Sequence, residues 1–114
     1  MSQVMQGSVS IAANSNADVL ENKINAIVDP AVRGAIVRFA CTGSATGLEA
    51  EGWVGQRNPL ERSGVSTQNR IPLDPDDIVA INIAARPNER IRCKAFNTTG
   101  GALTFFYRVT VDEL

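Results

Sequence analysis

Basic side chains alternate along one short stretch of the chain. Arg90, Arg92 and Lys94 are separated by single residues, so in a β-strand all three lie on one face. Such a row can bind a phosphate, a sugar acid or the carboxylates of a partner protein. Arg108, on the strand expected next to it, can extend the row. We expect the row to form salt bridges on an outer face, within one subunit or at a contact between subunits, in preference to a ligand site.

A second alternating stretch carries Glu49, Glu51 and Trp53. The two carboxylates offer counter-charges to the basic row, within one subunit or between subunits. A tryptophan on such a face can stack on a sugar ring or anchor a protein interface. The equally favoured alternative places Trp53 in the core, covered by the polar passage 56–70.

The sequence contains no histidine and only two lysines. This composition excludes Ser/His/Asp and Cys/His nucleophilic systems and removes the commonest general base and zinc ligand. We therefore expect a protein that is not an enzyme, with no catalytic residues, no metal site and no cofactor. The acidic stretch 74–77 lacks the ligand spacing of an EF-hand loop, and it is predicted to be a solvated turn rather than a calcium loop.

Two cysteines, Cys41 and Cys93, each fall on the apolar face of an expected strand. We predict buried free thiols in preference to a disulfide, which a chain of this length does not need. Asn97-Thr98-Thr99 matches a glycosylation sequon, but it is better interpreted as part of a hairpin turn.

Length and charge restrict the possible partners. The 114 residues predict one domain that can bury a core unaided, and residues 1–6 are expected to form a flexible N-terminal arm. The net charge of −1 gives no general attraction to nucleic acid. The N-terminus lacks the pattern of a signal peptide, and no apolar run has the length of a membrane span, so we expect no membrane insertion.

Hydrophobic alternation predicts an all-β fold. The strongest signal is residues 103–111, where five apolar side chains alternate with four others over nine residues. Residues 17–28 are ambiguous: we expect a strand at 18–23, with a short helix as the alternative. A short strand within 64–69 can interrupt the polar passage. The other expected strands are 6–13, 35–42, 48–55, 78–84 and 90–96.

Seven to eight short strands at spacings of about ten residues predict an antiparallel β-sandwich. A single jelly roll is the preferred arrangement because the connections are too irregular for a meander. An immunoglobulin-like sandwich is the alternative.

The chain from residue 35 onward resembles small single-jelly-roll structural proteins of bacterial viruses, such as minor capsid, vertex, decoration and spike proteins. The resemblance depends on three segments: GSATGL at 43–48, NRIP at 69–72 followed by PDD at 75–77, and NTTGGALT at 97–104. It implies a virion component, made in the host cytoplasm, that assembles with copies of itself as a trimer or pentamer and with other virion proteins. A carbohydrate- or receptor-binding sandwich module, with Trp53 at the site, is the alternative function.

Overall fold

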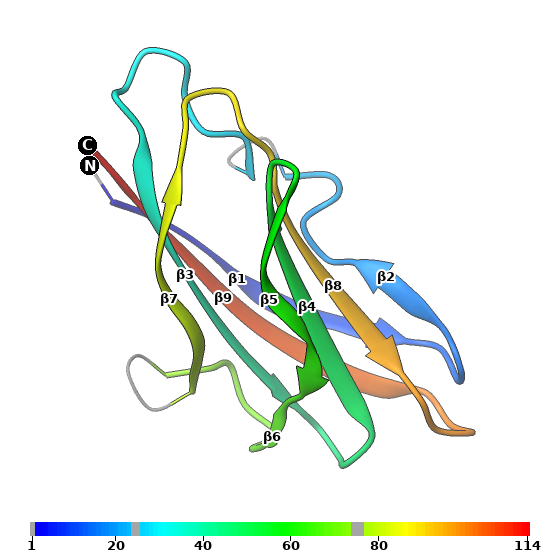
Figure 1. The fold of residues 1–114 in the computed structure, drawn as a ribbon. Helices are drawn as coiled ribbons and strands as arrows, with labels where there is room; N and C mark the ends of the chain where they lie inside the picture. Colours follow the sequence, from blue (N-terminus) through cyan, green and yellow to red (C-terminus); the bar gives the residue numbers. More distant parts are fainter. Residues whose placement is uncertain (1, 24–25, 74–76) are drawn as a thin grey trace.

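The computed structural model describes residues 2–23, 26–73 and 77–114. The described residues form nine β-strands arranged as two packed sheets, which confirms the expected all-β sandwich (Figure 1). The strands are β1 (Ser2–Ile11), β2 (Asn16–Asp18), β3 (Ala35–Gly43), β4 (Leu48–Val54), β5 (Arg57–Gly64), β6 (Ser66–Thr67), β7 (Ile78–Ala85), β8 (Ile91–Asn97) and β9 (Leu103–Glu113).

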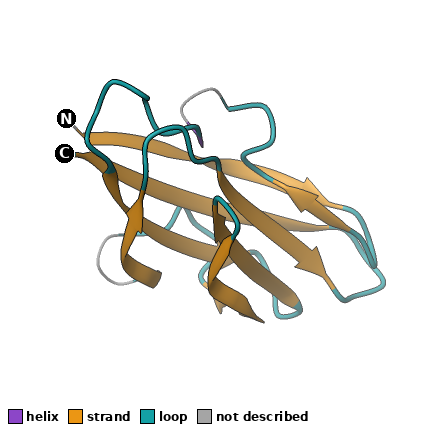
Figure 2. Ribbon diagram, turned by 45° about the horizontal axis from the view of Figure 1, so that its top comes forward, coloured by secondary structure: helices purple, strands orange, loops and turns teal. Residues whose placement is uncertain are grey.

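The first sheet has the order β1-β9-β3, and both β7 and the short β6 pair with the far edge of β3. The second sheet has the order β2-β8-β4-β5. Early strands therefore pair with late ones in a nested pattern, β1 with β9, β2 with β8 and β3 with β7, around the β4–β5 hairpin. Figure 2 shows the two layers and places both chain termini at one end of the sandwich.

The core lies between the sheets and follows the predicted alternation. On β9 the buried face carries Phe105, Tyr107, Val109 and Val111, and on β8 it carries Ile91, Cys93 and Ala95. Phe39 of β3 packs against Gly52 of β4, where a β-carbon would lie only 3.3 Å from the Phe39 ring. A small residue at position 52 therefore lets the two sheets approach closely.

Two expectations about the N-terminal part differ from the structure. Residues 2–6, expected to form an arm, are the first half of β1 and pair with the end of β9. The strand expected at 18–23 is wrong: β2 ends at Asp18, and 19–22 form turns with i→i+3 hydrogen bonds. The reason is Asp18 itself, whose Oδ1 accepts a hydrogen bond from the Leu20 N–H and turns the chain out of the sheet.

The polar passage 56–70 is mostly regular structure. It contains β5, an edge strand that forms a hairpin with β4, and β6, which lies within the range where a short strand was expected. Only Leu60 of β5 is buried, and Pro59 is tolerated because the strand is at the sheet edge. A strand with one buried residue and a proline gives no alternating signal, so the pattern missed it.

Candidate functional site

The outer face of the second sheet brings together most of the predicted site residues. The β4–β8 register pairs Glu49 with Phe96, Glu51 with Lys94 and Trp53 with Arg92. All six side chains are half-buried, on the side of the sheet opposite the core. The structure thus brings Arg92 and Lys94 of the basic row onto one face with Glu49, Glu51 and Trp53, and it places Trp53 outside the core. We call these six residues the β4/β8 face.

The indole of Trp53 is held by its neighbours. Its Nε1–H donates to Glu51 Oε1 at 2.7 Å, and the Arg92 guanidinium lies 5.1 Å from the ring centre. A cation over an aromatic face is attracted by the ring quadrupole. A sugar that stacked on the same ring face would have to displace Arg92, so Trp53 is not a bare stacking platform.

A second set of contacts covers the other end of the face. Arg62 of β5 donates through Nε to Glu49 Oε1 at 2.8 Å, and its guanidinium lies 4.1 Å from the centre of the Phe96 ring. Glu49 therefore finds its counter-charge on β5 rather than on the basic row. The two acids of the predicted site are each engaged inside the subunit.

Arg108 does not extend the basic row, and this expectation is wrong. Its strand, β9, pairs with β1 and β3 in the first sheet, opposite Gln6 and Ala40. Local alternation places Arg108 on an outer face correctly, but it cannot say to which of the two sheets that face belongs. An ion pair on the same sheet joins Arg38 and Asp112, with 3.7 Å between Nη2 and Oδ2.

Arg90 lies at the end of the second sheet, where the chain turns from β7 into β8. It pairs with Ile27 in an isolated bridge, one residue before β8 begins. Together with Arg92 it lines a polar hollow of about 500 Å³, whose other lining residues are Gly55, Gln56, Asn88 and Glu89. The β4–β5 turn and the β7–β8 turn, which form this hollow, lie side by side in Figure 1.

Gly55 connects the two turns and was not singled out by the sequence. It has a φ of +62° and is the first residue of a two-residue hairpin loop, the position that type II′ turns give to glycine. Its N–H donates to the Arg90 carbonyl at 2.9 Å, and its own carbonyl accepts from Arg92 Nη2 at 3.3 Å. In the sequence, a glycine directly after Val54 could have indicated a tight turn, but only the fold shows which residues Gly55 contacts.

Glu89 supplies the negative charge of the hollow. Its Oε1 accepts from Arg57 Nη2 and from the Arg86 N–H, both at 2.7 Å. Arg57 thus pairs with this carboxylate, whereas Arg90 and Arg92, which line the same hollow, have no ion-pair partner among the described residues.

A second hollow, of about 340 Å³, lies near the chain termini between β1, β9 and residues 27–30. Its side chains bond among themselves or to nearby backbone: Gln3 Nε2 donates to Glu113, and Asp29 Oδ1 accepts from the Ala31 N–H. This hollow brings together none of the predicted site residues.

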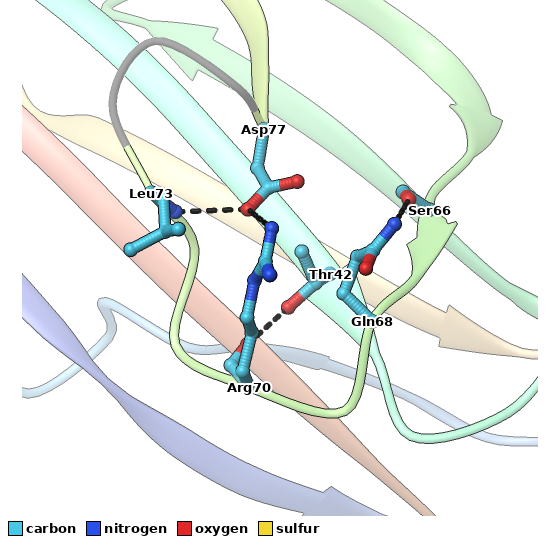
Figure 3. Close-up of polar contacts among 6 residues, drawn as sticks. All are labelled: Thr42, Ser66, Gln68, Arg70, Leu73 and Asp77. Atoms are coloured by element: carbon cyan, nitrogen blue, oxygen red, sulfur yellow. Dashed lines mark hydrogen bonds and ion pairs between the residues drawn. The ribbon is translucent and has the colours of Figure 1, made fainter.

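The acidic stretch 74–77 can be assessed only at Asp77, because residues 74–76 lie outside the described residues. Asp77 is 7% exposed, and its Oδ2 accepts from the Leu73 N–H at 2.9 Å and from Arg70 Nη2 at 3.2 Å (Figure 3). The same loop is fastened to the first sheet where Thr42 Oγ1 donates to the Arg70 carbonyl. At this residue the expected solvated turn is wrong, because the carboxylate is buried and holds the loop together.

The sequon residue Asn97 is also structural. It is 3% exposed; its Nδ2 donates to the carbonyls of Ile11 and Gly101, and its Oδ1 accepts from the N–H and hydroxyl of Thr99. Both amide protons are therefore used, which favours the interpretation as a hairpin-turn residue.

Within the ranges that the structure describes, no helix is long and apolar enough to cross a membrane, and no three metal-ligating side chains gather into a group. A scan against protein-family models finds no match for the chain, and neither curated proteins nor solved structures give a significant one.

Proposed function

We propose that the protein is a non-enzymatic structural component of a virion, which assembles with copies of itself into a ring of three or five subunits. The observation that carries this proposal is the free edge of β1. That strand is ten residues long, ends the first sheet, and has β9 as its only strand partner among the described residues.

The edge of β1 has no charge, no proline and no bulge that would protect it against pairing. Monomeric proteins cover such edges or interrupt them with charges, prolines or bulges, because the outward N–H and C=O groups can bind another strand. Residues 2–11 contain no charged residue and no proline, and their register with β9 runs without a bulge. Val4 is 46% exposed on this strand. A strand or surface of a second copy is the partner that this edge fits.

The fold supports the same proposal. Strand orders β1-β9-β3-β7 and β2-β8-β4-β5 result when a long antiparallel hairpin is wrapped into two sheets, which is how an eight-stranded jelly roll with two Greek keys is built. We therefore propose the jelly roll as the finer description of the sandwich, with β6 as an addition. The resemblance to virion jelly rolls points in the same direction. A contact between β1 and a different surface of the next copy gives a ring when its rotation closes, whereas a contact of β1 with β1 gives a dimer.

The second candidate function is recognition of a carbohydrate or receptor. Trp53 supports it less than expected, because Arg92 occupies a ring face and Glu51 the indole N–H. The hollow at Arg90 and Arg92 is the better location for such a ligand.

Light scattering after size-exclusion chromatography, over a dilution series, tests the assembly. We expect a mass of three or five times the 12.2 kDa chain that persists on dilution. A strict monomer would contradict assembly, and a dimer would contradict the ring.

A lysine on β1 tests the contact itself. Val4→Lys puts a charge on the exposed side of the edge strand and is expected to shift the mass to that of the monomer. The matched control is Ser63→Lys on β5, the edge of the other sheet, whose neighbours Glu61 and Arg62 are already charged. If Val4→Lys leaves the mass unchanged, or if Ser63→Lys dissociates the ring equally, β1 is not the contact.

A further inference from the structure

We propose that the hollow between the β4–β5 and β7–β8 turns binds the anionic group of a small polar ligand, a carboxylate or a phosphate, through Arg90 and Arg92. This site is separate from the assembly contact at β1. Its volume of about 500 Å³ lies within the roughly 300–1,000 Å³ range of small-molecule sites.

Arg90 and Arg92 have N–H donors that make no hydrogen bond to the described residues. A guanidinium group carries five N–H donors. Within the ranges that the structure describes, Arg90 makes one side-chain hydrogen bond, a long one of 3.4 Å to the Glu21 carbonyl, and Arg92 makes one, to the Gly55 carbonyl. Neither has an ion-pair partner among the described residues. Most of the donors that line the hollow are thus available to an acceptor with several oxygens, which carboxylates and phosphates are.

Arg92 is held in place before any ligand arrives. Its guanidinium contacts the Trp53 ring on one side and bonds to Gly55 in the turn that forms the wall of the hollow. A side chain that is already ordered loses little conformational freedom when it binds a ligand. Arg90, by contrast, is exposed, so its removal is not expected to disturb the fold.

The charge of the lining favours an anion over a neutral sugar. Glu89 opposes anion binding, but its carboxylate is neutralised by Arg57 at 2.7 Å and by the Arg86 N–H. With Glu89 paired to Arg57, Arg90 and Arg92 supply the unpaired charges of the lining, and they attract an anion in a protein whose overall charge is slightly negative.

Three probes separate the possible ligand chemistries: glucuronate for a sugar carboxylate, glucose 6-phosphate for a sugar phosphate, and glucose as the neutral control. Isothermal titration and amide chemical-shift mapping of the full chain at constant ionic strength provide the affinity and its location. We expect saturable binding of one or both anions with shifts at residues 55–56 and 88–92, and no saturation with glucose. Whichever anion binds more tightly identifies the group that the site prefers.

Variants then test the two arginines. Arg90→Gln and Arg92→Gln are each expected to weaken anion binding roughly tenfold or more, because a charge-assisted hydrogen bond is lost. Arg62→Gln is the matched control: it lies on the same sheet, outside the hollow, and should leave the affinity unchanged. Glu89→Gln should strengthen binding several-fold, because it removes the opposing charge while keeping an acceptor for the Arg86 N–H.

The proposal is overturned if neither anion saturates the protein, if glucose binds as tightly as the anions, or if Arg62→Gln weakens binding as much as Arg90→Gln does. The last outcome would mean general charge attraction at the sheet surface. Because these readouts measure ligand binding and the assembly test measures mass, either proposal can fail without the other.

Discussion

The thiols of Cys41 and Cys93 face each other across the sandwich, with their Sγ atoms 4.0 Å apart. Cys41 comes from β3 of the first sheet and Cys93 from β8 of the second, and both are fully buried. They are free thiols, as the sequence predicted. The hydrogen bond between them and the loss of hydration raise the pKa of Cys93 well above its ordinary value of 9.0.

This pKa shift predicts a loss of stability in alkali. Near pH 7, well below the ordinary thiol pKa, both the folded and the unfolded chain keep the Cys93 proton, so this thiol adds no pH dependence there. Above 9.0 the unfolded chain releases the proton while the folded chain retains it, so the free energy of unfolding falls as pH rises, by up to about 1.4 kcal/mol per pH unit.

Urea unfolding between pH 7 and pH 10.5, with a reductant present, measures this slope. Cys93→Ala should be less stable at pH 7 but should lose less stability toward pH 10.5, because the variant lacks the thiol whose proton release favours the unfolded chain. Parallel pH profiles for the two proteins would show that Cys93 does not carry the effect.

Asp77 is expected to stabilise the loop that joins β6 to β7. Asp77→Ala removes the buried carboxylate that accepts from the Leu73 N–H and the Arg70 guanidinium, which should cost about 1–3 kcal/mol in the free energy of unfolding. Asp77→Asn keeps an acceptor and should cost less. Chemical denaturation is the measurement, with exposed Glu61→Ala as the control that should change stability by no more than about 0.5 kcal/mol. Equal effects of Asp77→Ala and Glu61→Ala would contradict the structural role.

Asn97 is expected to be sensitive even to an isosteric change. Asn97→Asp replaces a donor that faces two carbonyls with an acceptor, so we expect a loss of at least about 1–3 kcal/mol. Exposed Asn22→Asp introduces the same chemical change without buried partners and should be nearly neutral. Thermal unfolding of the two variants at one pH provides the comparison. Equal melting temperatures for Asn97→Asp and Asn22→Asp would show that the hydrogen bonds of the Asn97 side chain do not stabilise the fold.

A side chain at Gly55 is expected to destabilise the protein. A methyl group there would overlap the Glu89 carboxylate, and the φ of +62° costs an L-residue about 1–2 kcal/mol. Gly55→Ala should therefore destabilise the protein by at least that amount. Gly100→Ala is the matched control, since a β-carbon at position 100 meets nothing within 4 Å, and its effect should stay within about 0.5 kcal/mol. Denaturant titrations measure the free energy of unfolding of both variants. Equal stabilities would show that the β4–β5 turn can adjust to a side chain at position 55.

For four strands the sequence by itself determined which face points toward the core. In β9, β8, β3 and β4 the alternation of apolar and polar residues is local, since neighbouring side chains of a strand must point to opposite faces. The class of fold, the buried cysteines and the outward position of Arg92, Lys94 and Glu51 followed from that geometry alone.

Only the tertiary structure decided which strands lie together. It separated Arg108 from the basic row, brought Gly55 against Glu89 and buried Asp77 beneath its loop. It also showed that residues 2–6 belong to β1, and that a polar segment with one buried leucine forms β5. The physical reason is range: alternation depends on adjacent residues, whereas sheet membership and the hollow at Arg90 depend on contacts between residues far apart in the chain, which no local pattern encodes.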